Sequence, residues 1–472
     1  MGRMRRSGPV APVALRRVAF GLVLVVAAVM AQVQLRSPGS DAAVIEAPTT
    51  TVTLPTTTEA PTTTTSSSTT TTTTEPPPTT TTTAPAPAPA GFVEAVTAAL
   101  GDPRFESATV GLSVWVEGSG MVLGQHADTN LRPGSNEKLL VAWGALGQLG
   151  PATTFVTDVR VDGELDGSAV RGNLVLVGAG DPSLRSTGRH SLDRLAAVVR
   201  ERGITEVTGD LVVDESHFDT ERQAPGWTPR HVPNFVGPVS ALAVDGNVFR
   251  TDPEYLANPA VGNLGAFRAA LAGRGVNVAG GERTGTAPDP TATVASVRSG
   301  PVTDLVRDML TNSDNFYAEM LLKSVGQAVW GRVTFGNGMA VIHGLAAEAG
   351  VQLSGRAADG SGLSRDNSRR PREWMELLVA ARTQPWFGQL HDGLPLAGRS
   401  GTLLNRFRGT PAEANARAKT GSVQQTRSLS GYLTTAGGKQ VVFSLIVNGN
   451  PLPGAVIGAM DNVISTMAAS RS

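Results

Sequence analysis

The sequence predicts an α/β (α+β) domain in which helices flank an antiparallel sheet and a mostly β segment is inserted in the middle. Strand-like alternation occurs near both ends of the folded region, at residues 110–123 and 418–447. Helical spacing of apolar residues lies between them, at residues 135–149 and again from residue 302. Residues 151–294 instead hold short apolar runs broken by Gly, Asp and Pro. This order indicates one layered domain opened by an insertion.

Length and composition exclude several function classes. The chain has 472 residues, enough for two folded domains plus tails. It has no cysteine, which excludes disulfides, thiolate metal ligands and cysteine nucleophiles. Lys and Arg balance Asp and Glu at 40 each, and no basic stripe lies outside the extreme N-terminus, so we expect no nucleic-acid partner. The six histidines include no close ligand pair, so we expect no metal site.

Residues 1–35 have the pattern of a signal peptide or a membrane anchor. Five arginines precede an apolar run at residues 18–31, which is short for a membrane span. Cleavage and retention both fit this pattern. In either case we expect the remainder to work outside the membrane, facing the cell wall or periplasm, secreted or anchored. Residues 36–90 follow as a predicted disordered linker, because their Thr, Ser and Pro runs offer no core.

The main domain is divided into residues 91–150 and 295–472, on either side of an inserted domain at residues 151–294. We expect helices in the main domain at residues 92–100, 135–149 and 456–467. We expect its strands at residues 110–116, 121–123, 418–423, 429–434 and 441–447. The inserted domain is expected to contain one or two helices, one of them near residues 264–271.

Lysine is rare in this chain and stands at two informative positions. Of four lysines, Lys138 closes an S-x-x-K motif that begins at Ser135, and Lys419 opens the K-T-G motif Lys419-Thr420-Gly421. Arginine keeps its proton in proteins, whereas burial can lower the pKa of a lysine enough for it to act as a base. The presence of lysine at Lys138 therefore favours an activated serine at Ser135.

A third motif, Ser313-Asp314-Asn315, lies between the other two along the sequence. We expect S-x-x-K on the first turn of a helix, with Ser135 and Lys138 on one face. S-x-N is expected in a turn beside a helix, and K-T-G on a strand. Each motif alone is a weak signal, but the three in this order are specific.

These residue types suit acyl transfer from a peptide whose last residue leaves as an amine. Ser135 is the expected nucleophile, and Lys138 is the base that takes its proton. Ser313 is expected to pass the proton to the leaving group, and Asn315 to bind the substrate amide. No G-x-S-x-G motif and no convincing His/Asp pair supports another serine chemistry.

The K-T-G strand supplies the expected substrate contacts. Lys419 and Thr420 can hold a terminal carboxylate through charge and a hydroxyl group. Gly421 is expected to let the substrate backbone approach the strand. The main-chain N–H groups of Ser135 and Ser422 form the expected oxyanion hole.

The chain resembles the D-alanyl-D-alanine carboxypeptidase/endopeptidase family, the class C low-molecular-mass penicillin-binding proteins. The resemblance covers nearly all of residues 91–472. Its main segments are residues 133–139, 178–184, 239–242, 313–315 with 318–319, 359–365 and 418–421. It implies a transpeptidase/β-lactamase-like catalytic domain, with a second domain inserted between the first two motifs. It also implies that Arg365 helps to hold the peptide stem.

The implied function is that of an exported serine D-Ala-D-Ala carboxypeptidase of peptidoglycan, acting through a Ser135 acyl-enzyme and inhibited by β-lactams. Cutting of D-Ala cross-links, an endopeptidase activity, fits the same motifs. The implied partners are peptidoglycan stem peptides, with no cofactor, and with membrane contact only through an uncleaved N-terminal segment. Two alternatives are a β-lactamase and a non-catalytic wall-binding scaffold. The sequence offers no fast deacylating base for the first, and three intact motifs argue against the second.

Two features depart from the family pattern. The insertion is shorter than usual. The stretch after Trp227, residues 228–235, also lacks the acidic residues and tyrosines that often meet the free amine of the stem peptide. The preferred side chain of the stem peptide is therefore open at this point.

Overall fold

The computed structural model describes residues 91–471 except residues 249, 289–291 and 332. The predicted signal or anchor segment and the predicted linker lie outside these residues. Within the described part of the chain, no helix combines the length and the hydropathy needed to cross a membrane.

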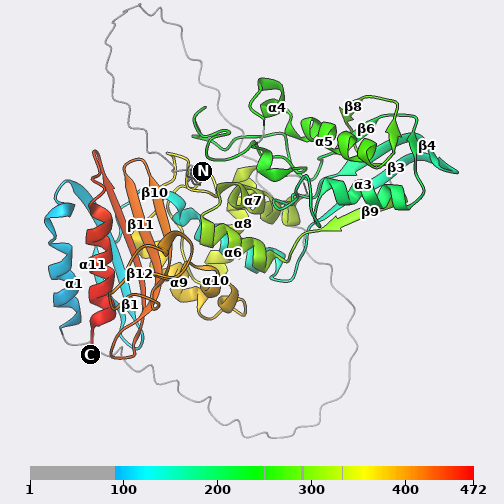
Figure 1. The fold of residues 1–472 in the computed structure, drawn as a ribbon. Coiled ribbons are helices and arrows are strands. Elements are labelled where there is room, and N and C mark those ends of the chain that lie inside the picture. The colour runs from blue at the N-terminus through cyan, green and yellow to red at the C-terminus, as the bar shows by residue number, and fades with distance from the viewer. Residues whose placement is uncertain (1–90, 249, 289–291, 332, 472) are drawn as a thin grey trace, which may run out of the picture. The chain divides into compact units, whose positions relative to one another are not determined.

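A five-stranded antiparallel sheet forms the centre of the main domain (Figure 1). Its spatial order is β10-β11-β12-β1-β2. The strands are β1 (Ala108–Val116), β2 (Gly120–Gln125), β10 (Arg417–Val423), β11 (Thr426–Thr434) and β12 (Gln440–Gly449). β1 pairs with β12 along its whole length. Segments from opposite ends of the described chain therefore lie side by side in one sheet.

Helices cover both faces of this sheet (Figure 1). Side chains of a strand point alternately to the two faces, and β12 is apolar on both. Phe443 packs in one core with α1 (Phe92–Leu100) and α11 (Val456–Ala469). Val442 and Ile446 belong to the core on the opposite face. The predicted α/β domain with an antiparallel sheet flanked by helices is confirmed.

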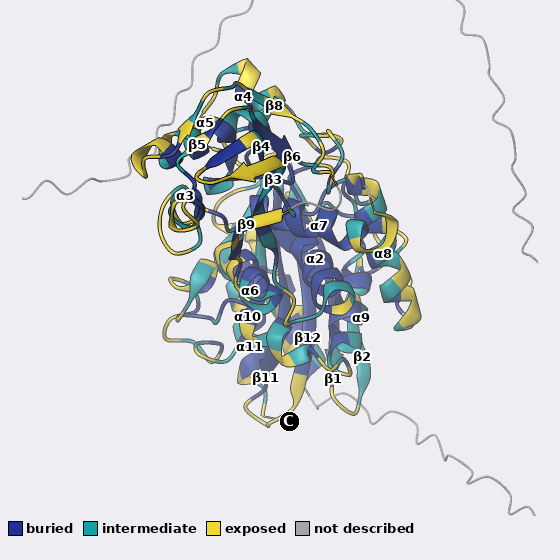
Figure 2. Cartoon of the chain, turned by 90° about the vertical axis from the view of Figure 1, so that its right-hand side faces the viewer, coloured by how far each residue is buried: buried dark blue, intermediate teal, exposed yellow. Residues whose placement is uncertain are grey.

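The helices of the second face carry the first two motifs. The 3₁₀ turn η2 (Gly134–Glu137) runs into α2 (Lys138–Gly144) and then into a π-helical turn, Ala145–Leu149. The S-D-N motif lies between α6 (Val302–Asn312) and α7 (Asn315–Trp330). The layer is completed by α8 (Phe335–Glu348), α9 (Pro371–Ala381) and α10 (Phe387–Gly393). Every residue of α2 is buried, so this helix lies at the centre of the layer (Figure 2).

The segment between β2 and β10 also contributes a second sheet, of seven strands. Three strands pair antiparallel, namely β3 (Val156–Asp166), β4 (Ala169–Val177) and β9 (Ala292–Arg298). Four shorter strands pair in parallel, namely β5 (Glu206–Val207), β6 (Leu211–Asp214), β7 (Asn277–Val278) and β8 (Glu282–Thr284).

Among the described residues between β3 and β9 there are three α-helices, one more than the upper expectation for the insertion. They are α3 (Leu192–Glu201), α4 (Pro253–Ala257) and α5 (Pro259–Gly273). The unexpected α3 is capped by the Ser191 side chain, which accepts a hydrogen bond from the Arg194 N–H. It buries Leu192, Leu195 and Val199 against the second sheet. The apolar residues of α3 thus recur at helical spacing in a region where most apolar runs have strand patterns.

Candidate active site

Ser135 and Lys138 lie one helical turn apart at the start of the buried α2 helix. Ser135 is 9% exposed and Lys138 is fully buried. The Nζ atom of Lys138 lies 3.0 Å from Ser135 Oγ. It also donates hydrogen bonds of 2.7 Å to Asn315 Oδ1 and 2.7 Å to the Ser361 carbonyl oxygen. The predicted pairing of serine and lysine is thus present in the structure, together with a residue from the second motif.

Burial lowers the pKa of Lys138 to about 8, although the negative charges of Glu319, Asp359 and Asp314 oppose this shift. A neutral lysine amine has two N–H donors and one lone pair. Asn315 Oδ1 and the Ser361 carbonyl oxygen can only accept, so they use the two donors. The lone pair then faces the Ser135 hydroxyl, which is the geometry a general base requires.

The second motif is held by an unusual turn between two helices. Ser313 ends α6 with φ 58°, in the left-handed region. The side chain of Asp314 caps α7 by accepting from the Tyr317 N–H. Asn315 follows on the first turn of α7, where its Nδ2 atom donates to the Phe235 carbonyl oxygen at 2.9 Å. Because Phe235 belongs to the segment after Trp227, that segment forms part of the site.

Lys419 connects the third motif to the second. Its side chain is fully buried on β10, and Nζ donates to Ser313 Oγ at 2.9 Å and to the Thr420 carbonyl oxygen at 2.9 Å. Burial and the nearby charge of Lys138 lower the pKa of Lys419 well below its ordinary value. The Thr420 hydroxyl donates to Thr402 Oγ1 at 2.8 Å.

The structure gives a different physical reason for glycine at position 421 from the one expected. A Cβ atom at this position would lie 2.1 Å from Ser428 Oγ and 2.8 Å from the Pro133 carbonyl oxygen. It would also lie 3.1 Å from the Ser135 nitrogen. The missing side chain therefore lets β10 approach the turn that carries Ser135, so glycine serves the packing of the protein itself.

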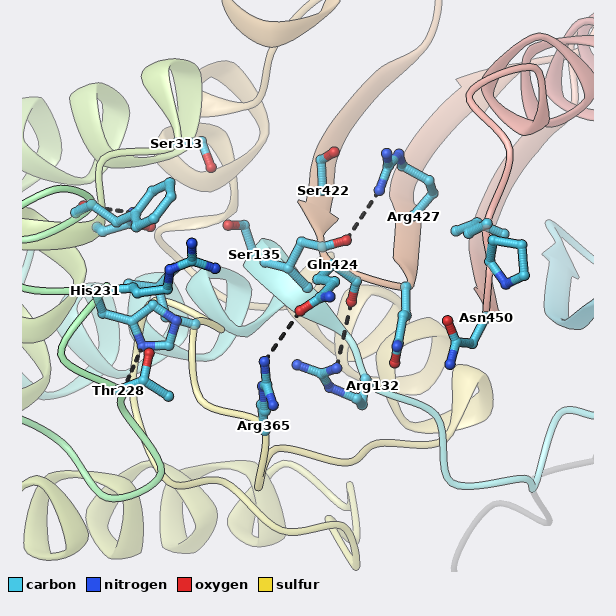
Figure 3. Close-up of a pocket in the computed structure, with 18 residues that line it drawn as sticks. Arg132, Ser135, Thr228, His231, Ser313, Arg365, Ser422, Gln424, Arg427 and Asn450 are labelled. Carbon is cyan, nitrogen blue, oxygen red and sulfur yellow. Dashed lines mark hydrogen bonds between the residues drawn. The ribbon is translucent and has the colours of Figure 1, made fainter. Parts of the chain in front are cut away.

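These elements surround a cavity of about 760 Å³ (Figure 3). Ser135 lines it together with four other predicted site residues, namely Ser313, Asn315, Arg365 and Ser422. Lys138, Lys419, Thr420 and Gly421 do not line the cavity. Arg365 reaches the far end of β10, where its Nη2 atom donates to Gln424 Oε1 at 3.1 Å.

The sequence predicted no role for a carboxylate that supports Lys138 indirectly, through the loop at Gly360 and Ser361. Glu319 is fully buried on α7 and accepts from the N–H groups of Gly360 at 2.9 Å and Ser361 at 2.8 Å. Burial, reinforced by the charge of Asp359, raises the pKa of Glu319 to about 8. Glu319 thereby fixes the Ser361 carbonyl that accepts from Lys138. The available signals were its position four residues after Asn315 and its place in the family resemblance at residues 318–319.

A buried ion pair, also missed, lies beside the nucleophile. Glu137 and Arg369 are both fully buried, with Arg369 Nε 3.3 Å from Glu137 Oε1. Burial raises the pKa of Glu137 to about 7 and outweighs the opposing charge of Arg369. Arg369 also donates to the Gly355 carbonyl oxygen at 3.0 Å. This pair anchors the first turn of the Ser135 helix to the loop before α9.

No cluster of three or more potential metal ligands occurs among the residues that the structure describes. The arrangement instead offers a nucleophile, a buried amine base, a second buried lysine and main-chain N–H donors. Together these groups can carry out acyl transfer through a serine ester.

The fold and the site place the protein among transpeptidase/β-lactamase-like enzymes, and comparison with known proteins gives the family. Residues 92–265 and 255–468 match the D-Ala-D-Ala carboxypeptidase 3 (S13) family. A D-alanyl-D-alanine carboxypeptidase of Actinomadura sp. (strain R39) is 31% identical over 450 residues, covering 78% of this chain and 83% of that protein. Carboxypeptidase DacB of Mycolicibacterium smegmatis is 32% identical over 397 residues, covering 77% of this chain and 81% of that protein.

A solved structure shows the same fold. The crystal structure of penicillin binding protein 4 (dacB) from Haemophilus influenzae superposes with a TM-score of 0.72 at 21% identity. The match covers 79% of this chain and 99% of that chain. The protein described here belongs to the D-Ala-D-Ala carboxypeptidase 3 (S13) family.

Proposed function

We propose that this protein is a serine-type D-Ala-D-Ala carboxypeptidase that acts on peptidoglycan stem peptides and is acylated by β-lactams. The observation that carries the proposal is the position of Lys138 Nζ, 3.0 Å from Ser135 Oγ and held by two acceptors at 2.7 Å. This arrangement directs a lone pair at the serine hydroxyl. Family membership gives the reaction class, and the carboxypeptidase names of two relatives support the substrate.

The proposed reaction has two stages. Ser135 Oγ attacks the carbonyl carbon between the last two D-Ala residues while its proton moves to Lys138 Nζ. The main-chain N–H groups of Ser135 and Ser422 stabilise the oxyanion. The C–N bond then breaks, and the terminal D-Ala leaves as an amine with a proton delivered through Ser313, while an ester remains on Ser135. Water hydrolyses this ester, which releases the shortened peptide and restores the serine.

The second and third motifs position the substrate in this proposal. Asn315 binds the substrate amide beside Lys138. Lys419 and Thr420 hold the terminal carboxylate, and Arg365 contacts the peptide stem. Cutting of D-Ala cross-links uses the same chemistry, with the side-chain amine of a neighbouring stem in place of the leaving D-Ala.

We also propose where the enzyme works. Residues 1–35 export or anchor the chain, residues 36–90 act as a linker, and residues 91–150 with 295–472 form the catalytic domain around the insert at 151–294. Five arginines before the apolar run at residues 18–31 support an orientation in which the positively charged N-terminus stays in the cytoplasm. The catalytic domain then faces the cell wall.

Labelling with a fluorescent penicillin tests the nucleophile. We expect a stable adduct on the full-length protein and none on Ser135→Ala. Ser296→Ala is a matched control, because Ser296 is exposed on β9 and bonded to Asp158. Absence of an adduct on folded wild-type protein would sink the proposal and favour a non-catalytic scaffold. Rapid turnover of the adduct would favour a β-lactamase instead.

A further inference from the structure

A second cavity, of about 480 Å³, adjoins the catalytic cavity at the S-D-N turn. Ser313, Asn315 and Phe235 line both cavities. The rest of its lining is separate and comes from Arg185, from residues within 236–248 and from residues within 314–317. The volume lies in the range of ligand sites. Apart from Ser313 and Asn315, the proposed reaction uses none of these residues.

The second cavity lies on the side of the leaving group. In the proposed reaction Ser313 delivers a proton to the leaving amine. Lys419, which donates to Ser313 Oγ at 2.9 Å, holds the carboxylate of the leaving residue. Residues 422–425 line only the first cavity, and in Figure 3 Ser313 stands on the side of Ser135 away from Asn450. A side chain on the leaving residue can therefore extend past Ser313 into the second cavity.

D-Alanine as a leaving residue offers only a methyl group to this space. In a D-Ala cross-link the leaving amine instead belongs to a second stem, and the remainder of that stem hangs from the leaving residue. This remainder needs room outside the catalytic cavity, on the side of Ser313. The second cavity is continuous with that position, because the same serine lines both cavities.

Exposed apolar side chains border the second cavity. Phe235 is 60% exposed and Val248 is 50% exposed, and both line it. The buried residues Phe316 and Tyr317 add to the same wall. Apolar groups that face water favour a ligand that covers them, so the methylene groups of a long leaving side chain would be stabilised here.

Among the described residues that line this cavity, Arg185 is the one cation. It is exposed, it has no carboxylate within ion-pair distance in the described part of the chain, and its Nη2 atom donates to the Tyr317 hydroxyl at 3.4 Å. Asp245 and Asp314 also line the cavity, but each accepts from a main-chain N–H, of Ser186 at 3.2 Å and of Tyr317 at 3.0 Å. The guanidinium donors that remain unused favour a carboxylate on the ligand.

The wall that carries Asp245 and Val248 is fixed from behind. Asp245 has φ 51° and Asn247 has φ 55°, both in the left-handed region. Asn247 is fully buried, its Nδ2 atom donates to the Pro238 carbonyl oxygen at 2.9 Å, and its Oδ1 atom accepts from the Val244 N–H at 3.1 Å. Such backbone angles persist only where the surrounding structure enforces them, so the turn holds this wall in place.

We infer that the second cavity, bounded by Phe235, Val248 and Arg185, is a binding site for the leaving group and selects leaving residues with a long side chain that ends in a carboxylate over D-alanine. The C–N bond after the first D-Ala breaks, the leaving amine takes its proton through Ser313, and the acyl group stays on Ser135 until water hydrolyses the ester. The inference rests on the proposed function and specifies its leaving-group class.

Matched leaving residues test this site. The substrates share one acyl peptide ending in D-Ala. The leaving residue is D-alanine, or D-lysine whose side-chain amine carries an acetyl group, a succinyl group that ends in a carboxylate, or a succinamyl group that ends in a carboxamide. All four keep the α-carboxylate that Lys419 is proposed to hold. Chromatography of the released residue gives kcat/KM for the full-length protein.

We expect the three acylated D-lysines to exceed D-alanine about tenfold in kcat/KM, as burial of two methylene groups allows. The succinyl substrate should exceed the succinamyl substrate about threefold, as an exposed ion pair allows. Added salt should reduce the second difference and leave the first.

Variants assign the two effects to the cavity. Val248→Asn and Arg185→Gln replace exposed side chains, so folding should be kept. Val248→Asn should reduce the advantage of acylated D-lysine over D-alanine at least about threefold, through KM more than kcat. Arg185→Gln should abolish the preference for succinyl over succinamyl. Leu165→Asn on β3 and Arg189→Gln are matched controls, because both side chains are exposed and line neither cavity, and they should leave both ratios unchanged.

The outcomes separate the two proposals. Equal kcat/KM for D-alanine and for the acylated D-lysines would overturn the inference and leave the proposed function standing. A preference for acylated D-lysine that both variants leave unchanged would also overturn it, because the leaving side chain would then lie elsewhere. A carboxamide as good as the carboxylate would overturn the assignment of Arg185. If no leaving residue is released and no penicillin labels Ser135, the proposed function fails and the inference fails with it.

Discussion

Acylation of Ser135 should accelerate as pH rises, because it requires Lys138 in its neutral form. Burial lowers the pKa of Lys138 to about 8, so the amine loses its proton as pH increases through that value. The neutral fraction is about 1% at pH 6 and about 50% at pH 8, a rise of roughly 50-fold, and it levels off above pH 9. A lysine with its ordinary pKa would not approach a plateau in this range.

The assay is the second-order rate constant of acylation by a chromogenic β-lactam, measured by stopped flow from pH 6 to pH 9.5. We expect one rising limb with a midpoint near pH 8. Lys138→Arg should remove the base and keep the positive charge, which lowers the rate about a hundredfold to ten-thousandfold. Lys439→Arg is the matched control, because Lys439 is exposed, and it should leave the profile unchanged.

Two results would refute this reasoning. A rate that is flat across the range would mean that Lys138 is already neutral at pH 6 or takes no part in proton transfer. A Lys138→Arg variant with wild-type acylation and an unchanged thermal transition would show that another group removes the proton from Ser135.

Two further predictions concern the packing around the nucleophile. Gly421→Ala should slow acylation at least about tenfold, because its Cβ would meet Ser428 Oγ and push β10 away from Ser135. Gly454→Ala, which adds a methyl group in open space, should not; equal rates for both variants would contradict the packing argument. Arg369→Ala should lower the free energy of unfolding by about 3–5 kcal/mol, since it leaves the Glu137 carboxylate buried and unpaired. Arg372→Ala breaks a partly exposed pair and should cost at most about 1 kcal/mol in denaturant unfolding, and similar losses for both would argue against the buried pair.

The sequence was most informative where chemistry is local. Ser135 and Lys138 are three residues apart, so helical geometry alone predicts that they share a face. Alternation also located the strands of the five-stranded sheet, because at least one face of β1, β10, β11 and β12 is buried, although β2 has no fully buried residue. The contact between Lys419 and Ser313 is different in kind. No periodicity predicts that a strand near the C-terminus meets the turn between α6 and α7, and only the order of the motifs suggested it.

The parts that could not be predicted depend on long-range burial. Glu319 resembles any polar residue in a helix, but α7 is buried nearly all round through Gly326, so its carboxylate faces the interior. The Phe235 carbonyl that accepts from Asn315 is a main-chain group. Every residue has one, so the residue type at this position does not predict the contact. The residues of the second cavity are spread over much of the chain and become a site only when the insert and α7 meet.

The two buried lysines lead to a last prediction about the substrate itself. Acidic neighbours, chiefly Glu319, partly offset the effect of burial on the pKa of Lys138, whereas the charge of Lys138 adds to the effect of burial on the pKa of Lys419. In the empty site, burial and the charge of Lys138 both favour the neutral form of Lys419. A terminal carboxylate beside Lys419 would stabilise its charged form, and that charge would then disfavour a proton on Lys138. The substrate thus helps to prepare its own base. A peptide ending in D-Ala-D-alaninamide should accordingly lose kcat as well as affinity, and the pH midpoint of kcat should rise. An unchanged kcat with only a higher KM would show that the two lysines titrate independently.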